Sequence, residues 1–178
     1  MTKRINSKNK GNKAERGVAQ ALSEWADIKF IRTPSSGGAF HLSGLKVFGD
    51  IIPADPQDMV RFPFTVEVKS YKGIDFEAPL LGQNTNWKDW WNQVDQDAER
   101  SGKLPIVFMR RNLMPKGEHY CILSWDVFDT LDELKAFRHP RGYYNYWNEL
   151  VIFPSRDLLR TPYPEIETVL NNIQWNEL

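Results

Sequence analysis

The sequence has little cysteine, no long apolar run and no excess of charge of either sign. Its single cysteine, Cys121, excludes an internal disulfide and a zinc site built from a cysteine cluster. Every apolar run is far shorter than the roughly 20 residues that cross a bilayer, and no apolar signal-peptide segment opens the chain. We therefore expect a cytoplasmic protein that has no membrane partner.

The balanced net charge conceals an uneven distribution along the chain. Residues 1–16 hold six lysines and arginines against one acid, Glu15, whereas the stretch from Asp126 to the last residue holds nine acids against five bases. A basic segment can bind phosphates locally while the whole chain stays neutral. A flexible, solubilising tail is the alternative interpretation of residues 1–9.

The length and composition are those of one folded domain. The chain has 178 residues, 41% of them hydrophobic, and includes seven tryptophans, which is enough for a sizeable core. Composition and patterning divide it into a disordered basic tail over residues 1–9, a core over 10–125, and a C-terminal extension over 126–178 that packs on the same domain.

Apolar residues recur at helical spacing in two stretches, residues 13–26 and 87–101, and each is predicted to be a helix. Gly102 ends the second helix as a left-handed cap. Two further helices are expected in the extension, over 124–137 and from residue 164. The apolar stripe of the first helix comprises Ala14, Val18, Leu22 and Trp25. That of the second comprises Trp87, Trp91, Val94 and Ala98.

Stretches rich in β-branched and aromatic residues predict a central sheet. The five predicted strands cover residues 28–32, 47–52, 64–71, 104–110 and 119–125. We expect a polar turn over 53–63 and an irregular segment over 72–86. The order of elements indicates an α/β fold, with a mixed five-stranded sheet flanked by helices. The C-terminal extension is expected to be helical, apart from a short strand at 150–153.

Charged residues interrupt two of these predicted strands. Asp50 enters the run 47–52, and Glu67 and Lys69 lie two residues apart within 64–71. Side chains alternate along a strand, so Glu67 and Lys69 point to one face, about 6–7 Å apart, and Val66 and Val68 point into a core. Two carboxylates beside a lysine are typical of a site for a hard metal ion. A structural ion pair on an exposed sheet face is the alternative.

The order Asp50, sixteen intervening residues, then Glu67-Val68-Lys69 matches the (P)D…(D/E)xK pattern of metal-dependent nucleases, with Gly49 in place of the usual proline. Asp50, Glu67 and the backbone carbonyl of Val68 would bind Mg²⁺, which polarises a phosphate and lowers the pKa of a bound water. Lys69 would hold or deprotonate that water and offset charge in the transition state.

Five segments together resemble the archaeal-type Holliday junction resolvases and their phage relatives over about residues 10–111. The segments are Lys10-Gly11…Ala14-Glu15-Arg16, Arg32 to Gly38, Gly49 to Ile52, Glu67 to Ser70, and Trp90 to Gln93 continued by Asp97-Ala98…Gly102 to Pro105. The resemblance implies a restriction-endonuclease-like fold, a homodimer, and paired nicking of four-way DNA junctions that depends on Mg²⁺, with Mn²⁺ as a substitute.

The resemblance also implies roles for further residues. Glu15 matches a glutamate of the first helix that is a catalytic residue and a further candidate metal ligand. Ser36 matches a loop serine near the active site, with Ser35 as the alternative. Gln93 is expected to reach the catalytic water or a phosphate, although a helix-surface glutamine is the alternative. The expected DNA-binding residues are Lys10, Lys13, Arg16, Arg32, Ser35 and Lys72. Arg110 and Arg111 are either DNA contacts or solvated arginines at a strand end.

The sequence therefore predicts a Mg²⁺-dependent, structure-selective DNA endonuclease of the Holliday junction resolvase type, with branched DNA as its partner. The first alternative is another nuclease of the same superfamily that cuts duplex or flap DNA in repair, restriction or phage genome processing. The second is a non-catalytic DNA-binding module of the same fold. The expected location is the cytoplasm of a bacterial or archaeal cell, or of a phage-infected host cell.

Overall fold

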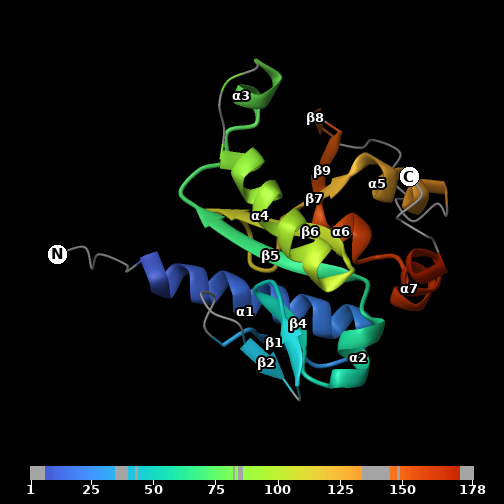
Figure 1. The fold of residues 1–178 in the computed structure, drawn as a ribbon. Coiled ribbons are helices and arrows are strands. Elements are labelled where there is room, and N and C mark those ends of the chain that lie inside the picture. The colour runs from blue at the N-terminus through green and yellow to red at the C-terminus, as the bar shows by residue number, and fades with distance from the viewer. Residues whose placement is uncertain are drawn as a thin grey trace.

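A mixed β-sheet with helices on both faces forms the centre of the protein (Figure 1). The computed structural model describes residues 7–34, 40–42, 44–81, 83, 86–133, 145–147 and 149–172. Within them the sheet has seven strands in the order β1-β4-β5-β6-β7-β9-β8, of which only β5 and β6 run parallel. The predicted mixed α/β architecture is confirmed and is consistent with a restriction-endonuclease-like fold, but the predicted count of five strands is wrong.

The strands of the large sheet are β1 Phe30–Arg32, β4 Ile51–Pro53, β5 Phe64–Tyr71, β6 Leu104–Arg111, β7 Tyr120–Ser124, β8 Asn145–Trp147 and β9 Leu150–Pro154. A separate hairpin pairs β2 Phe40–Leu42 with β3 Leu45–Val47. The helices are α1 Ser7–Ala26, α2 Pro56–Arg61, α3 Glu77–Leu80, α4 Asn86–Ser101, α5 Trp125–Glu133, α6 Ser155–Leu158 and α7 Tyr163–Asn172. None of the helices in the described part is long and apolar enough to cross a membrane.

Helix α1 lies across one face of the sheet, against β1, β4 and β5. The predicted apolar stripe is confirmed, because Ala14, Val18 and Leu22 are buried in the core that also contains Val66 and Val68 of β5. The helix begins at Ser7, earlier than predicted, so residues 7–9 are helical rather than part of a tail.

Helix α4 covers the other face of β5 and β6, and Figure 1 shows α1 and α4 on opposite sides of β5. The prediction that Trp91 belongs to its buried stripe is wrong. The buried position belongs to Trp90, whose ring packs on Tyr71 with centroids 4.5 Å apart, while Trp91 is half-buried. Trp90 is three residues after Trp87 and four before Val94, so these three side chains share one helix face.

The C-terminal extension completes the same core. Strand β9 pairs with β7 and carries β8 at its other edge, so the extension contributes strands to the sheet as well as helices. The indole N–H of Trp25 in α1 donates to the carbonyl of Thr161 at 2.7 Å, just before α7. Pairing between distant strands is what raised the strand count above the sequence-based prediction.

The segment 53–63, predicted to be a polar turn, contains helix α2. The carboxylate of Asp55 accepts from the backbone N–H of Gln57 at 2.8 Å, and Pro56 occupies the first turn. This is a favoured helix start, because aspartate satisfies a free N–H and proline needs no partner there. The Lys103 ammonium donates to the carbonyls of Met59 and Phe62 near the other end.

Candidate active site

A sharp backbone bend delivers Asp50 to the start of β4. The prediction of one continuous strand over 47–52 is wrong, because β3 ends at Val47 and β4 begins only at Ile51. Gly49 between them has a φ of +81°, and a Cβ on it would lie 2.7 Å from the carbonyl oxygen of Val66. The left-handed backbone and the lack of space both require glycine, and proline is excluded because its φ is fixed near −65°.

Three hydrogen bonds hold this bend between β1 and β5. The hydroxyl of Thr33 donates to the carbonyl of Gly49 at 2.8 Å, and the N–H of Thr33 donates to the carbonyl of Asp50 at 2.8 Å. On the other side, the N–H of Asp50 donates to the carbonyl of Val66 at 2.7 Å. Thr33 is a positioning residue that the sequence interpretation missed, and its place within the Arg32-to-Gly38 segment was the available signal.

The Asp50 carboxylate lies against the edge of β5. Its Oδ2 atom accepts from the backbone N–H of Val68 at 2.9 Å. Because the N–H and C=O of one residue in a strand point to the same neighbour, the carbonyl of Val68 also faces the side on which Asp50 lies. The structure thus brings together the three groups predicted to bind a metal ion: the Asp50 and Glu67 carboxylates and the Val68 carbonyl.

Glu67 and Lys69 point from β5 toward α4, as the alternation along the strand predicts. The Lys69 ammonium donates to Glu67 Oε1 at 2.5 Å and to Gln93 Oε1 at 2.9 Å. The Gln93 amide in turn donates to Glu67 Oε1 at 3.0 Å. Glu67 is only 4% exposed, so this ion pair lies inside the protein rather than on an open sheet face. Gln93 therefore belongs to the site by contact, and α4 supplies it.

Glu15 enters the site from α1. It accepts from Nε of Arg32, whose Nη2 donates to Asn12 Oδ1 at 2.9 Å. Asn12 was not predicted; its position one helical turn before Glu15 puts both side chains on one face, where they can share the arginine. The predicted DNA contact Arg32 is thus bound to a predicted catalytic glutamate in this structure.

Burial and neighbouring charges raise the proton affinity of both the Asp50 and the Glu67 carboxylate. The pKa of Asp50 is raised from its ordinary value, mainly by burial and also by the charge of Glu15, although the Val68 N–H bond opposes this. Burial, together with repulsion from Asp50, raises the pKa of Glu67 to about 7 despite the nearby Lys69 ammonium. A buried carboxylate, Glu67, that is repelled by the half-buried Asp50 forms a site where a divalent cation would relieve the repulsion.

The donor set fits magnesium. Two carboxylates and one backbone carbonyl are hard oxygen ligands, and Mg²⁺ is usually held by one or two carboxylates while it retains several waters. Among the described residues, no three carboxylate, imidazole or thiolate side chains gather into a complete cage. Two carboxylates and a carbonyl leave the other positions around a Mg²⁺ ion to waters.

The remaining predicted site residues lie elsewhere. Lys10, Lys13 and Arg16 line a groove formed by α1 and the β6–β7 turn. Lys72 is exposed just beyond the end of β5. Ser35 and Ser36 lie outside the described residues. Of the predicted DNA-binding residues, Arg32 thus lies beside the carboxylates and Lys10, Lys13 and Arg16 lie in the groove, whereas Lys72 belongs to neither place.

Two comparisons with known proteins bear on this arrangement. The family described as "Phage putative PDDEXK endonuclease" matches residues 6–151 of the chain. Protein D14 of Escherichia phage T5 is 30% identical over 111 residues, which are 61% of this chain and 66% of that relative. The family match spans α1, Asp50, the β5 residues and Gln93, so it contains every described residue of the site. The chain belongs to this family of phage PDDEXK endonucleases.

Proposed function

We propose that this protein is a Mg²⁺-dependent DNA endonuclease whose active site comprises Asp50, Glu67 and Lys69. The observation that supports this most directly is the convergence of the buried Glu67 carboxylate, the half-buried Asp50 carboxylate, both with raised pKa values, and one ammonium, which binds Glu67 at 2.5 Å. A fold that needed only a stable core would not retain repelling carboxylates here. Perturbed titratable groups that gather in this way are a mark of catalytic sites.

Asp50, Glu67 and the Val68 carbonyl are the groups that would hold the cation. A bound Mg²⁺ supplies charge that polarises the scissile phosphate and lowers the pKa of a coordinated water. The surrounding protein fixes its ligands: the Val68 N–H orients Asp50, while Lys69 and Gln93 both bind one oxygen of Glu67.

Lys69 is placed to act on the attacking water and on the developing negative charge. Its ammonium is held between Glu67 and Gln93, so its position is set before substrate arrives. A preorganised cation of this kind stabilises the transition state without rearrangement during the reaction. Gln93 orients both of the groups that it touches, and Glu15 holds Arg32 at the α1 side of the site.

The substrate is proposed to be branched DNA, as the sequence resemblance to Holliday junction resolvases implies, and the enzyme is proposed to act as a homodimer. The alternative is a nuclease that cuts duplex or flap DNA during phage genome processing. The match to a family of phage endonucleases and the relative from Escherichia phage T5 support this alternative as well as they support a resolvase. Both proposals use the same active site and differ only in the DNA that reaches it.

A panel of labelled DNAs separates these functions. The protein is incubated with Mg²⁺ and a four-way junction, a flap or a linear duplex, alongside Glu67→Gln and the exposed control Asp129→Asn. Symmetric nicks near the branch point, lost only in Glu67→Gln, support the resolvase. Comparable cleavage of linear duplex would overturn junction selectivity. Binding without cleavage of any DNA would overturn the assignment as an enzyme.

A further inference from the structure

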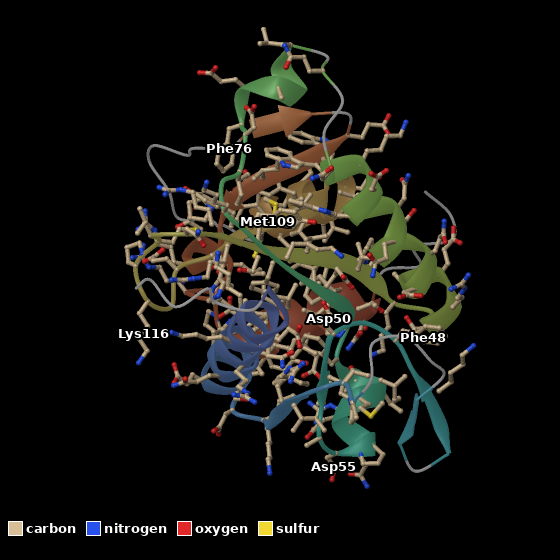
Figure 2. All side chains as sticks on the ribbon, turned by 90° about the vertical axis from the view of Figure 1, so that its left-hand side faces the viewer. Phe48, Asp50, Asp55, Phe76, Met109 and Lys116 are labelled. Atoms are coloured by element: carbon tan, nitrogen blue, oxygen red, sulfur yellow. The ribbon has the colours of Figure 1, made fainter. Side chains whose placement is uncertain are left out.

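A basic groove lies on the side of α1 that faces away from the carboxylates. The groove measures about 810 Å³ and runs between the N-terminal half of α1 and the β6–β7 turn. Figure 2 shows Lys116 of the turn on one side of α1 and Asp50 on the other. Asn12 and Glu15 of α1 face the active site, whereas Lys10, Lys13 and Arg16 line the groove. One helix therefore separates two differently charged regions.

The charge of the groove has a single sign. Among the described residues that line it, six are lysine or arginine and none is aspartate or glutamate: Lys10, Lys13, Arg16, Arg110, Arg111 and Lys116. Within the described part of the chain, no hydrogen bond or ion pair engages the side chains of the three lysines or of Arg16. Cations gathered on two facing walls repel one another, so their natural partner is a polyanion.

Arg110 has a structural part in this groove. Its Nη1 donates to the carbonyls of Pro115 and Glu118 at 2.9 and 3.0 Å, and its Nη2 donates to the carbonyl of Met114 at 2.6 Å. These bonds tie the turn into one shape. Lys116 and Arg111 are thus presented from a fixed wall rather than from a loose loop, which lowers the entropic cost of binding.

The tip of the turn presents an exposed leucine between these cations. Leu113 is 96% exposed and has a φ of +65°, in the left-handed region that a bulky residue seldom adopts. A leucine in this position favours neither folding nor solubility. A left-handed backbone held at such a point is reason to look for a binding role.

We propose that this groove binds the phosphate backbone of a DNA segment outside the active site, and that Leu113 packs against the sugars or unstacked bases of that segment. The proposal rests on the proposed nuclease function for the identity of the polyanion. The cations contribute the sequence-independent attraction. Apolar side chains that contact base steps contribute in several proteins that bend or open DNA. A branched or flapped DNA would offer one segment to the active site and another to the groove.

The test measures binding of a short labelled duplex in EDTA, where no cleavage occurs, across a salt titration. Lys13→Gln/Lys116→Gln is compared with the control Lys29→Gln/Lys88→Gln, which removes two exposed lysines elsewhere and keeps the same net charge. Loss of two phosphate contacts should reduce the slope of log affinity against log salt by about 2. An unchanged slope would overturn the proposal, and an acidic protein partner would then be the better candidate.

Leu113→Asn tests the apolar part, because asparagine accepts a left-handed backbone and preserves the turn. Affinity should fall about tenfold at every salt concentration, with the slope unchanged. Wild-type affinity in this variant would exclude a role for Leu113.

Cleavage assays on the same proteins separate the two proposals. If wild type cleaves DNA and the lysine variant binds DNA normally, the proposal of a DNA-binding groove is wrong and the nuclease proposal stands. If the lysine variant binds DNA more weakly but wild type cleaves no DNA, the nuclease proposal is wrong and the groove proposal stands.

Discussion

The two faces of β5 are buried alike but affect stability in opposite ways. Val66 and Val68 point into the core beneath α1, and burial of their apolar surface stabilises the fold. Glu67 points toward α4 and is 4% exposed, but its pKa of about 7 shows that burial disfavours its charged form. One face of the strand therefore stabilises the fold, whereas the other carries Glu67, whose charged form destabilises it. The core face supplies the rigidity that the site face needs.

The largest effect is expected when the site face is neutralised. Asp50→Asn should lower cleavage on the order of a thousandfold, because a ligand of the cation is lost. Above pH 7, where Glu67 is charged, the melting temperature of the metal-free protein should rise, since the repulsion that Asp50 exerts on Glu67 and that Glu15 exerts on Asp50 is removed while the Val68 N–H can still donate to the amide oxygen. Calorimetry beside a nicking assay measures both, and a lower melting temperature would contradict the comparison.

Disruption of the core face should have the opposite signature. Phe64→Ala removes a buried ring that contacts Phe62 with centroids 5.8 Å apart. The free energy of unfolding should fall by about 3–5 kcal/mol. Cleavage per folded molecule, measured at a temperature where the variant remains folded, should stay near that of wild type. A specific loss of turnover would show that the two faces are not separable.

Gly49 holds Asp50 beside β5, and Gly102 is the matched control for its substitution. Both glycines have positive φ, +81° and +64°, but a Cβ on Gly102 would meet no atom within 4 Å. Gly102→Ala should cost about 1 kcal/mol of stability from backbone strain alone. Gly49→Ala should cost at least about 2 kcal/mol, because its Cβ also collides with β5. Only Gly49→Ala should reduce cleavage, since it displaces Asp50; equal effects would contradict this.

The pH dependence of metal binding, the smallest of the expected effects, tests whether burial on the site face of β5 keeps Glu67 protonated. In the metal-free protein Glu67 keeps its proton up to a pKa of about 7, well above the ordinary 4.5, so a cation must displace that proton at lower pH. Affinity for Mg²⁺ should rise by up to tenfold per pH unit below 7 and level off above. The same raised pKa affects the stability of the metal-free fold. Protonated Glu67 adds to the free energy of unfolding relative to charged Glu67; this contribution is complete below pH 4.5 and is lost as the pH rises to about 7 and above. Titration calorimetry in buffers of different ionisation heat measures the released proton, and a flat profile would contradict the assignment.

Local patterns in the sequence predicted much of this structure. Helical spacing identified the buried stripe of α1, and strand alternation placed Glu67 and Lys69 opposite Val66 and Val68. The pattern also placed Trp91 in the stripe that Trp90 occupies, because neighbouring residues are only 100° apart on a helix. Helix α2 was missed although Asp55 and Pro56 carried its signal.

Features that depend on distant contacts could not be predicted. The pairing of β9 with β7 and the resulting seven-stranded sheet follow from tertiary packing rather than from local periodicity. The basic groove joins α1 to a turn about a hundred residues later in the chain, and each part alone resembles a solvated surface. A single glycine in an apolar run does not reveal its φ, so the sequence predicts a strand where the structure has the bend at Gly49.

Gly49 also bears on how relatives of this protein can be found. The usual motif has proline before the aspartate, but proline cannot adopt a φ of +81°, so chains with proline must reach the aspartate by another backbone path. A pattern search that demands the letter P would pass over a chain built like this one. Sorting homologous sequences by this single position would divide them into two backbone solutions that bring the same carboxylate to the same strand.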